Sequence, residues 1–296
     1  MQDFRVRTFL TVCKTLNYTR AAEELSLTQP AVSQHIAFME KEYGAKLFTY
    51  HHKKLQLTPA GRVLKVALST MAHDDKLLHE RIAEVAHGAK TTLRIGMTLT
   101  AGQYVVAASL ASYLAEHPQI RAHVRSGDTS KLLALMAEGE IDCAFVEGLF
   151  DKAAYAWDAF RTERLVCICG AGRRPTGRVH GFEDLLGERL ILREPGSGSR
   201  AVLEGALTQR NLSTAAFADT CVVESLNIIK IFVARGLGIS FVYESAVQQE
   251  VEAGILDAIP LPKENLSHDI SFIRLKDSLF EPVLRDLFEG IDNAEE

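Results

Sequence analysis

The chain contains no run of apolar residues that approaches the roughly 18 needed for a transmembrane helix. Its first twenty residues break their apolar positions with Arg5, Arg7 and Lys14, so they lack the apolar stretch of a secretory signal peptide. Because neither a membrane span nor an export signal is evident, we expect a soluble protein that stays in the cytoplasm.

Cysteine is also scarce. The five cysteines are scattered, odd in number and contain no CxxC pair. This usage is typical of reduced, buried thiols rather than of a secreted disulfide framework. Cys167 and Cys169 would share one face of a strand, where packing is favoured over a metal or redox role. The neighbouring His51 and His52 have no carboxylate or cysteine nearby to complete a metal site. We therefore expect no metal and no cofactor.

The common catalytic motifs are absent. The chain has no GxSxG nucleophile elbow, no GxxxxGK[ST] phosphate loop and no GxGxxG after a strand. An enzyme is still the strongest rival, because hydroxyl-rich loops on an α/β frame can also host catalysis. An exported solute-binding protein would lack residues 1–87, and a redox sensor would need a reactive cysteine where Ser199 stands. We expect no enzymatic activity.

Charge is distributed unevenly along the 296 residues. The composition, 47% hydrophobic and 24% charged, is that of a folded protein, and the length suggests two or three domains of ~100–200 residues each. The net charge of −5 conceals a split between the two ends. Residues 1–58 carry eight basic and five acidic side chains, whereas residues 93–296 carry 20 basic and 29 acidic ones. Only the N-terminal end is suited to approach a polyanion.

The N-terminal residues predict three helices separated by short turns, which is a helix-turn-helix pattern. Good N-cap residues precede or begin each predicted helix: Asp3, Thr19 and Thr28. On the third helix an apolar stripe faces the core and comprises Val32, Ile36, Met39 and Tyr43. The opposite face comprises Pro30, Ser33, Gln34, Ala37 and Lys41. Ser and Gln side chains can bind base edges and Lys41 a phosphate, although an ordinary polar surface helix would show the same pattern.

Two short strands follow, at 46–49 and 55–57, joined by a tip that contains Lys53 and Lys54. A hairpin with a basic tip is a wing. A long helix is then expected from Pro59, capped by Thr58, to about His87. Apolar residues recur along it at alternating spacings of four and three: Leu64, Leu68, Met71, Leu78, Ile82 and Val85, with Asp75 as a polar break. The spacing favours a coiled-coil dimer, with packing on the helix's own domain as the alternative.

Four runs of this segment closely resemble the N-terminal signature of LysR-type transcriptional regulators: AAEEL at 21–25, TQPAVSQHI at 28–36, KLF at 46–48 and LTPAG at 57–61. The resemblance implies that Gln29, Pro30, Ser33 and Gln34 contact the DNA groove, and that the wing contacts the phosphate backbone. Where the family commonly has arginine this chain has Tyr50, so that backbone contact passes to Lys53 or Lys54.

From Leu93 onward, short β-rich runs alternate with helical stretches, which predicts an α/β fold. Such sheets bind ligands beyond the carboxyl ends of their strands. Three loops at such positions, 98–102, 126–130 and 194–200, offer hydroxyls and backbone N–H groups at a helix start. These groups attract small anions. The plainer alternative is that the hydroxyls only cap their helices.

The runs GEID at 139–142, REPGSGSR at 193–200 and ARGLGI at 234–239 resemble the effector domain of the same family, which is similar to two-lobed periplasmic binding proteins. The resemblance implies a cleft lined by loop residues of both lobes: Thr98, Thr100, Thr129, Ser197, Gly198, Ser199 and Arg200. Arg200 has an alternative partner in Glu204, four residues on.

The expected fold is therefore an α/β effector domain with two Rossmann-like lobes, preceded by a predominantly helical winged helix-turn-helix domain and a long linker helix. The boundaries are 1–58, 59–88 and 89–296, with lobe 1 at about 91–161 plus 268–296 and lobe 2 at about 162–267. We expect a LysR-type regulator that binds promoter DNA and a small, anionic metabolite. It should form a homodimer through the linker helix and, by the family resemblance, a homotetramer.

Overall fold

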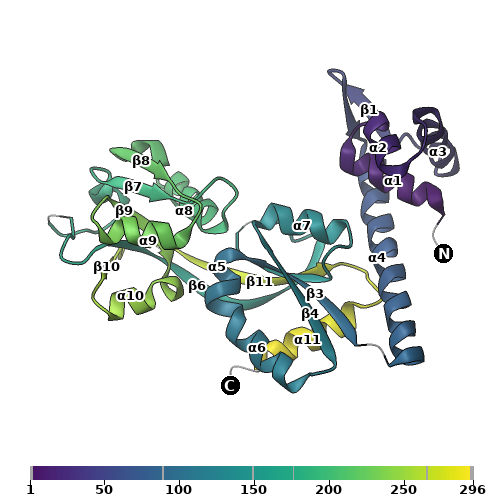
Figure 1. Cartoon of the computed structure of the whole chain (residues 1–296). Helices are drawn as coiled ribbons and strands as arrows, with labels where there is room; N and C mark the ends of the chain where they lie inside the picture. Colours follow the sequence, from purple (N-terminus) through teal and green to yellow (C-terminus); the bar gives the residue numbers. More distant parts are fainter. Residues whose placement is uncertain (1–2, 89, 149, 176, 265, 294–296) are drawn as a thin grey trace. The chain divides into compact units, whose positions relative to one another are not determined.

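The computed structural model describes residues 3–293 except 89, 149, 176 and 265 (Figure 1). The chain divides into two compact units. The first comprises residues 1–91 with the short segments 137–140 and 275–281. The second comprises residues 92–136, 141–274 and 282–296.

The first unit begins with three helices and a hairpin: α1 (Phe4–Thr15), α2 (Tyr18–Leu25), α3 (Gln29–Glu42), β1 (Phe48–His51) and β2 (Lys54–Leu57). The predicted caps of α1 and α3 are confirmed, since Asp3 accepts from the Arg5 N–H and Thr28 from the Ala31 N–H. Thr19 is not the cap of α2. Asn17 takes that place because its side-chain oxygen reaches the N–H groups of both Thr19 and Arg20.

The predicted apolar stripe of α3 is buried at Val32, Ile36 and Met39, which pack with residues of α1, α2 and the hairpin. The fourth member, Tyr43, is 52% exposed, so its assignment to the core was wrong. The reason is local: α3 ends at Glu42, and Tyr43 is the cap residue, where the helical spacing no longer applies. The hairpin strands also begin two residues later and one residue earlier, respectively, than the sequence predicts.

Helix α4 (Pro59–His87) forms over the predicted residues, and the Thr58 hydroxyl accepts from the Gly61 N–H at 2.9 Å. Its apolar positions fall into two groups. Leu64 and Leu68 pack against the core of the N-terminal helices, whereas the later positions are exposed: Met71, Leu78, Ile82 and Val85. The first part of α4 therefore completes its own domain, and the second part presents an uncovered apolar face.

The second unit contains nine strands in one connected sheet: β3 (Thr91–Thr98), β4 (Ile120–Gly127), β5 (Cys143–Val146), β6 (Tyr155–Gly170), β7 (Arg189–Leu192), β8 (Asp219–Val222), β9 (Ile239–Tyr243), β10 (Leu256–Ile259) and β11 (Ser267–Leu275). The strand order is β4-β3-β5-β11-β6-β9-β7-β8, with β10 paired to β6. Strands β3 and β5 are parallel, as are β8, β7 and β9. Strand β11 is antiparallel to β5, and β6 is antiparallel to β9 and β10.

The helices of this unit are α5 (Leu99–Ala101), a π-helical turn η1 (Gly102–Val106), α6 (Ala107–Glu116), α7 (Thr129–Ala137), α8 (Gly198–Gln209), α9 (Leu226–Ala234), α10 (Gln248–Glu252) and α11 (Glu281–Asn293). Short 3-10 turns lie at η2 (Phe182–Leu185), η3 (Thr214–Ala216) and η4 (Glu244–Ala246). The mixture of a helical N-terminal domain and an α/β sheet domain confirms the predicted fold class.

Two hydrophobic clusters lie on opposite faces of β6, because successive side chains of a strand point to opposite sides. Cys167 and Cys169 belong to the cluster that includes Leu203 of α8, whereas Val166 and Ile168 belong to the cluster under α9. The two cysteines are thus buried in packing, as predicted, and burial raises the pKa of both thiols. A third cluster joins β3, β5 and β11 to α6 and α11.

Within the described residues, no helix combines the length and the apolar character that crossing a bilayer requires.

Candidate DNA-binding face and effector cleft

The outward face of α3 has the exposure that DNA contact requires. The predicted contact residues are all exposed: Gln29, Pro30, Ser33, Gln34 and Lys41. They share the helix with the buried stripe of Val32, Ile36 and Met39, so the packing of that stripe fixes which way the polar face points. A helix held in this way can present amide and hydroxyl groups to base edges in a major groove.

The wing ends in a tight turn. His51 pairs with Lys54, and the two residues between them, His52 and Lys53, have φ angles of +47° and +62°. Positive φ at both central residues is the geometry of a type I′ turn, which suits the twist of a two-stranded hairpin. Lys53 and Lys54 are both exposed, and neither has an ion pair in the part of the chain that the structure describes. The tip therefore carries two positive charges available to a phosphate.

A cavity of about 310 Å³ opens in the α/β unit where strands of both halves of the sheet end. It is bordered by residues that follow β3, β7 and β8: Leu99, Thr100, Gln103, Tyr104, Arg193, Glu224, Ser225, Leu226 and Asn227. The carboxyl ends of parallel strands are the usual ligand-binding edge of such a sheet. The η1 turn that carries Gln103 and Tyr104 is π-helical, a geometry frequent at functional sites.

The predicted effector residues occupy different depths around this cavity. Thr100 borders it directly. The others of the predicted set are buried behind the surface, apart from Arg200: Thr98, Thr129, Ser197, Gly198 and Ser199. The Ser197 and Ser199 hydroxyls lie 3.1 Å apart and bond to each other. Neither of the helix starts at Thr98 and Ser197 has a side-chain capping bond, so these two hydroxyls are not simple N-caps.

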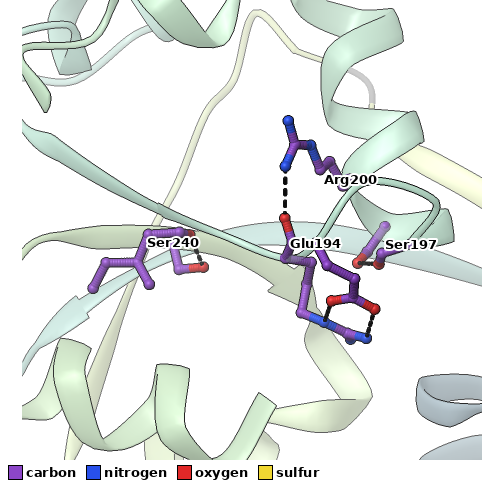
Figure 2. Close-up of polar contacts among 7 residues, drawn as sticks. Glu194, Ser197, Arg200 and Ser240 are labelled. Carbon is purple, nitrogen blue, oxygen red and sulfur yellow. Dashed lines mark hydrogen bonds and ion pairs between the residues drawn. The ribbon is translucent and has the colours of Figure 1, made fainter. Parts of the chain in front are cut away.

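Arg200 has its hydrogen bonds directed within the protein, and Figure 2 shows the one to the Arg193 carbonyl. Its Nε donates to Glu204 at 2.8 Å and its Nη1 donates to the Arg193 carbonyl at 3.0 Å. The i, i+4 pairing considered from the sequence is therefore present. The cation that borders the cavity is Arg193, which is 6% exposed and donates through Nε and Nη2 to the two oxygens of Glu194.

Sequence reasoning missed three polar residues at this site: Glu147, Arg193 and Tyr243. All three are buried, and each stands at or directly after the carboxyl end of a strand, β5, β7 or β9. A signal was present, since charged residues directly after apolar strand runs at the ligand-binding edge are unusual. The prediction concentrated on hydroxyl-rich loops and passed over them.

Glu147 is the centre of the polar contacts. The Thr100 hydroxyl donates to its carboxylate, and the Thr129 hydroxyl donates to its backbone carbonyl. Burial raises the pKa of Glu147 to about 7, with the Arg193 guanidinium and the Thr100 bond acting in the opposite direction. Burial, together with the nearby carboxylates of Glu147 and Glu163, also raises the pKa of Tyr243 well above its usual range. Three of the seven predicted residues, Thr100, Thr129 and Gly198, thus lie against one residue that the sequence did not predict, Glu147.

Glycine allows the backbones of β5 and α8 to approach closely at this point. A Cβ added to Gly198 would lie 2.4 Å from Glu147 Cγ, and one added to Gly148 would lie 2.9 Å from Gly198 Cα. Gly148 also has a φ of +91°. The Gly148 N–H donates to His268 Nε2 at 2.9 Å, and burial lowers the pKa of that histidine. Glycine is therefore needed at the start of α8 because the helix lies so close to Glu147, not because the backbone turns there.

No cluster of three or more His, Cys, Asp or Glu side chains suited to a metal ion occurs among the residues described.

Comparison with known proteins identifies the class. The model of the "LysR substrate binding domain" family matches residues 86–294, and that of the "Bacterial regulatory helix-turn-helix protein, lysR family" matches residues 5–62. Together they cover nearly the whole chain. The chain therefore belongs to the LysR family of transcriptional regulators, with a helix-turn-helix for DNA and a substrate-binding domain for an effector.

Relatives extend along most of the chain. The regulator CysL of Bacillus subtilis (strain 168) is 26% identical over 270 residues, which are 90% of this chain and 89% of CysL. The regulator CfxR of Cupriavidus necator is 31% identical over 273 residues, 89% of this chain and 83% of CfxR. Both are named as transcriptional regulators, in agreement with the expectation that this chain is not an enzyme.

Solved structures share the fold. Full-length LysG of Corynebacterium glutamicum with bound effector Arg has a TM-score of 0.67 at 20% identity, covering 99% of this chain and 98% of LysG. ArgP of Mycobacterium tuberculosis has a TM-score of 0.68 at 17% identity, covering 99% of this chain and 97% of ArgP. At these identities the likeness establishes the architecture alone.

Proposed function

We propose that this regulator reads its operator through the exposed face of α3, positions itself through the wing, and responds to a small anionic effector held in the cavity beside Thr100 and Arg193. The observation that carries the DNA contact is the exposed polar face of α3 set against its buried stripe. Since a DNA-binding regulator acts where the genome is, we also propose a cytoplasmic location.

The two sets of DNA contacts have different roles. Gln29, Pro30, Ser33 and Gln34 lie toward the first half of α3, and amide or hydroxyl groups there suit base edges. Lys41, Lys53 and Lys54 suit phosphates, which position a protein without reading sequence. The positive charge of residues 1–58 supports this arrangement.

The test of the DNA contact compares Gln34→Ala with Lys53→Ala in binding to duplexes selected by the wild-type chain. Gln34→Ala should reduce the preference for the selected sequence by ~1–3 kcal/mol, whereas Lys53→Ala should weaken all duplexes alike and flatten the salt dependence. Gln34 is exposed, so the melting temperature of the variant serves as the folding control. An unchanged sequence preference in Gln34→Ala would remove this residue from base readout.

The effector site extends from the cavity to the three loops of the sequence prediction. Thr98, Thr100 and Thr129 supply hydroxyls from the first half of the domain, and residues 197–200 supply Ser197, Gly198, Ser199 and Arg200 from the second. Arg193 adds a buried cation that borders the cavity. Hydroxyls, helix N–H groups and a guanidinium together are suited to an anionic group.

The proposed assembly is a homodimer through the exposed apolar residues of α4, and a homotetramer by pairing of effector domains. The proposed boundaries are 1–58, 59–88 and 89–296. The exposed Met71, Leu78, Ile82 and Val85 support the dimer, because a helix that leaves such a row uncovered buries it best against a second copy.

A further inference from the structure

Three buried polar atoms beside the proposed effector site have no hydrogen-bond partner among the described residues. They are Thr98 Oγ1, Glu147 Oε2 and Tyr243 Oη. Their residues are 2%, 3% and 1% exposed, so bulk water does not satisfy them. A buried polar atom without a partner is unfavourable, and the cost is greatest for a carboxylate. At a binding site such an atom is available to a bound ligand.

The Glu147 carboxylate is adjacent to the cavity. Thr100 and Arg193 both border the cavity, and both interact with Glu147. The Glu147 side chain also lies close to Gly198, the first residue of the twelve-residue helix α8. A ligand placed between Thr100, Arg193 and the start of α8 therefore has Glu147 as a neighbour.

The charges around this position are mostly negative. Arg193 is the one basic residue among the described residues that border the cavity, and two of its nitrogens bind Glu194. The carboxylates of Glu163 and Glu194 are close enough to Glu147 to raise its pKa further. Further out, Lys230 pairs with Glu250 and lies over the Tyr104 ring, and His268 accepts from Gly148. Above about pH 7, where Glu147 is ionised, an anion with no proton to donate would meet carboxylate repulsion there.

We propose that the effector carries, besides its anionic group, a hydrogen-bond donor that it directs to Glu147. This inference rests on the proposed effector site. The ligand class is an anion with a proton to give, either an oxyanion that remains monoprotonated near neutral pH or a zwitterion with an ammonium group. The anionic group binds Arg193 and the N-terminal end of α8, and the donor satisfies the free oxygen of Glu147. An isosteric anion without a donor is rejected.

Calorimetry on the full chain with matched probe pairs tests this inference. Inorganic phosphate is compared with sulfate, and glycine with acetate, at pH 8. At this pH Glu147, with a pKa of about 7, is mostly ionised, and only the first of each pair carries a donor. The donor-bearing member of one pair should bind roughly tenfold to one hundredfold tighter than its partner, as one hydrogen bond to a charged group requires. A preference within the first pair identifies a protonated oxyanion, and within the second an ammonium group.

Glu147→Gln is the decisive variant, because glutamine keeps the volume and replaces the free acceptor with an N–H donor. In this variant the ratio of the two affinities, donor-bearing over donor-free, should fall towards one. Sulfate or acetate should bind more tightly than to the wild type. Thr100→Val is the companion variant. It removes a hydroxyl that borders the cavity and should weaken both members of the pair, while the donor-bearing member stays preferred. The melting temperatures of both variants show whether they fold.

The outcomes separate this inference from the proposed site. If Thr100→Val weakens binding but the preference is unchanged in Glu147→Gln, the cavity is the effector site and the role of Glu147 is wrong. Equal or tighter binding of the donor-free anion, or no binding of either donor-bearing probe, also overturns the inference. If neither variant changes the binding of any probe, the proposed effector site itself fails.

Discussion

The carboxyl group of Glu147 lies in surroundings that favour its uncharged form, because burial raises its pKa from 4.5 to about 7. A carboxyl whose pKa is higher in the folded state stabilises the fold at low pH, and this contribution is lost as the pH rises through the folded value. Between about pH 4.5 and pH 7 the loss amounts to roughly 3 kcal/mol.

This pH dependence is testable by denaturant unfolding of the wild type and Glu147→Gln at pH 5 and pH 8. The wild type should lose stability relative to the variant at the higher pH, by up to about 3 kcal/mol. The exposed Glu224→Gln is the control and should follow the wild type. Parallel behaviour of the wild type and Glu147→Gln would show that Glu147 has an ordinary pKa.

At this scale the sequence predicted the hydroxyls but not the charges. Thr100 and Thr129 are identifiable because each lies at the start of a helix that closely follows a strand. Glu147 is buried by α8, which is distant in sequence. Arg193 pairs with its neighbour Glu194 and borders the same cavity as Thr100, which is also distant in sequence. The local sequence pattern does not reveal such burial, so a charged residue after a strand is predicted to be exposed to solvent. Arg200 was the cation that the sequence offered, and Glu204 holds it.

Among the elements, β5 and α8 approach so closely that only glycine fits at the start of α8. Gly198→Ala would place a methyl group 2.4 Å from Glu147 Cγ and 2.8 Å from its carbonyl oxygen, so we expect a destabilisation of about 1–3 kcal/mol. Gly205→Ala in the same helix is the matched control. Its Cβ would meet nothing within 4 Å, and it should stabilise the helix by about 0.5–1 kcal/mol. Thermal unfolding of both variants checks this, and equal effects would contradict the close approach.

Helix α4 gives the second element-scale prediction. Leu78 and Ile82 are 50% and 57% exposed, whereas Leu68 packs in the N-terminal core and is unsuitable for testing association. Replacing both Leu78 and Ile82 with lysine would place charges in the proposed dimer seam, so sedimentation at micromolar concentration should show that association through α4 is lost. At most, the pairs that form through the effector domains should remain. Ala86→Lys, an exposed position outside the seam spacing, should remain associated. A fully associated double variant would place the interface elsewhere.

Helices and strands that are marked by capping residues or apolar runs in the sequence were predicted well. Strands that depend on pairing with a distant strand were not. The start of α4 follows from Thr58 and Pro59 alone. By contrast, the first part of β6, from Tyr155 to Arg164, consists mostly of partly buried and exposed residues. Strand β10 forms through its pairing with β6. Neither segment has the apolar run that marks a strand in isolation. Tyr43 failed for a related reason, since the end of α3 interrupts the spacing that placed it in the core.

For the whole molecule, regulation requires that the effector bind one arrangement of the chain better than another, because equal affinity for both would shift nothing. The proposed site draws groups from strands on both sides of β6 and β11, at the ends of β3, β5, β7 and β9. A ligand that contacts both groups of strands can therefore stabilise one relative position of these groups over another. We expect the geometry of the DNA complex to respond more than the folded core.

The most direct test of this account measures the bend of an operator duplex, selected from a random library and labelled at both ends for energy transfer, as effector is added to the bound full chain. The account predicts a change in end-to-end distance with wild type. The same change should need roughly fivefold or more effector with Thr100→Val, as expected when a polar contact worth ~1–3 kcal/mol is lost. An operator bend that does not respond to saturating effector, or equal midpoints for the two proteins, would contradict it.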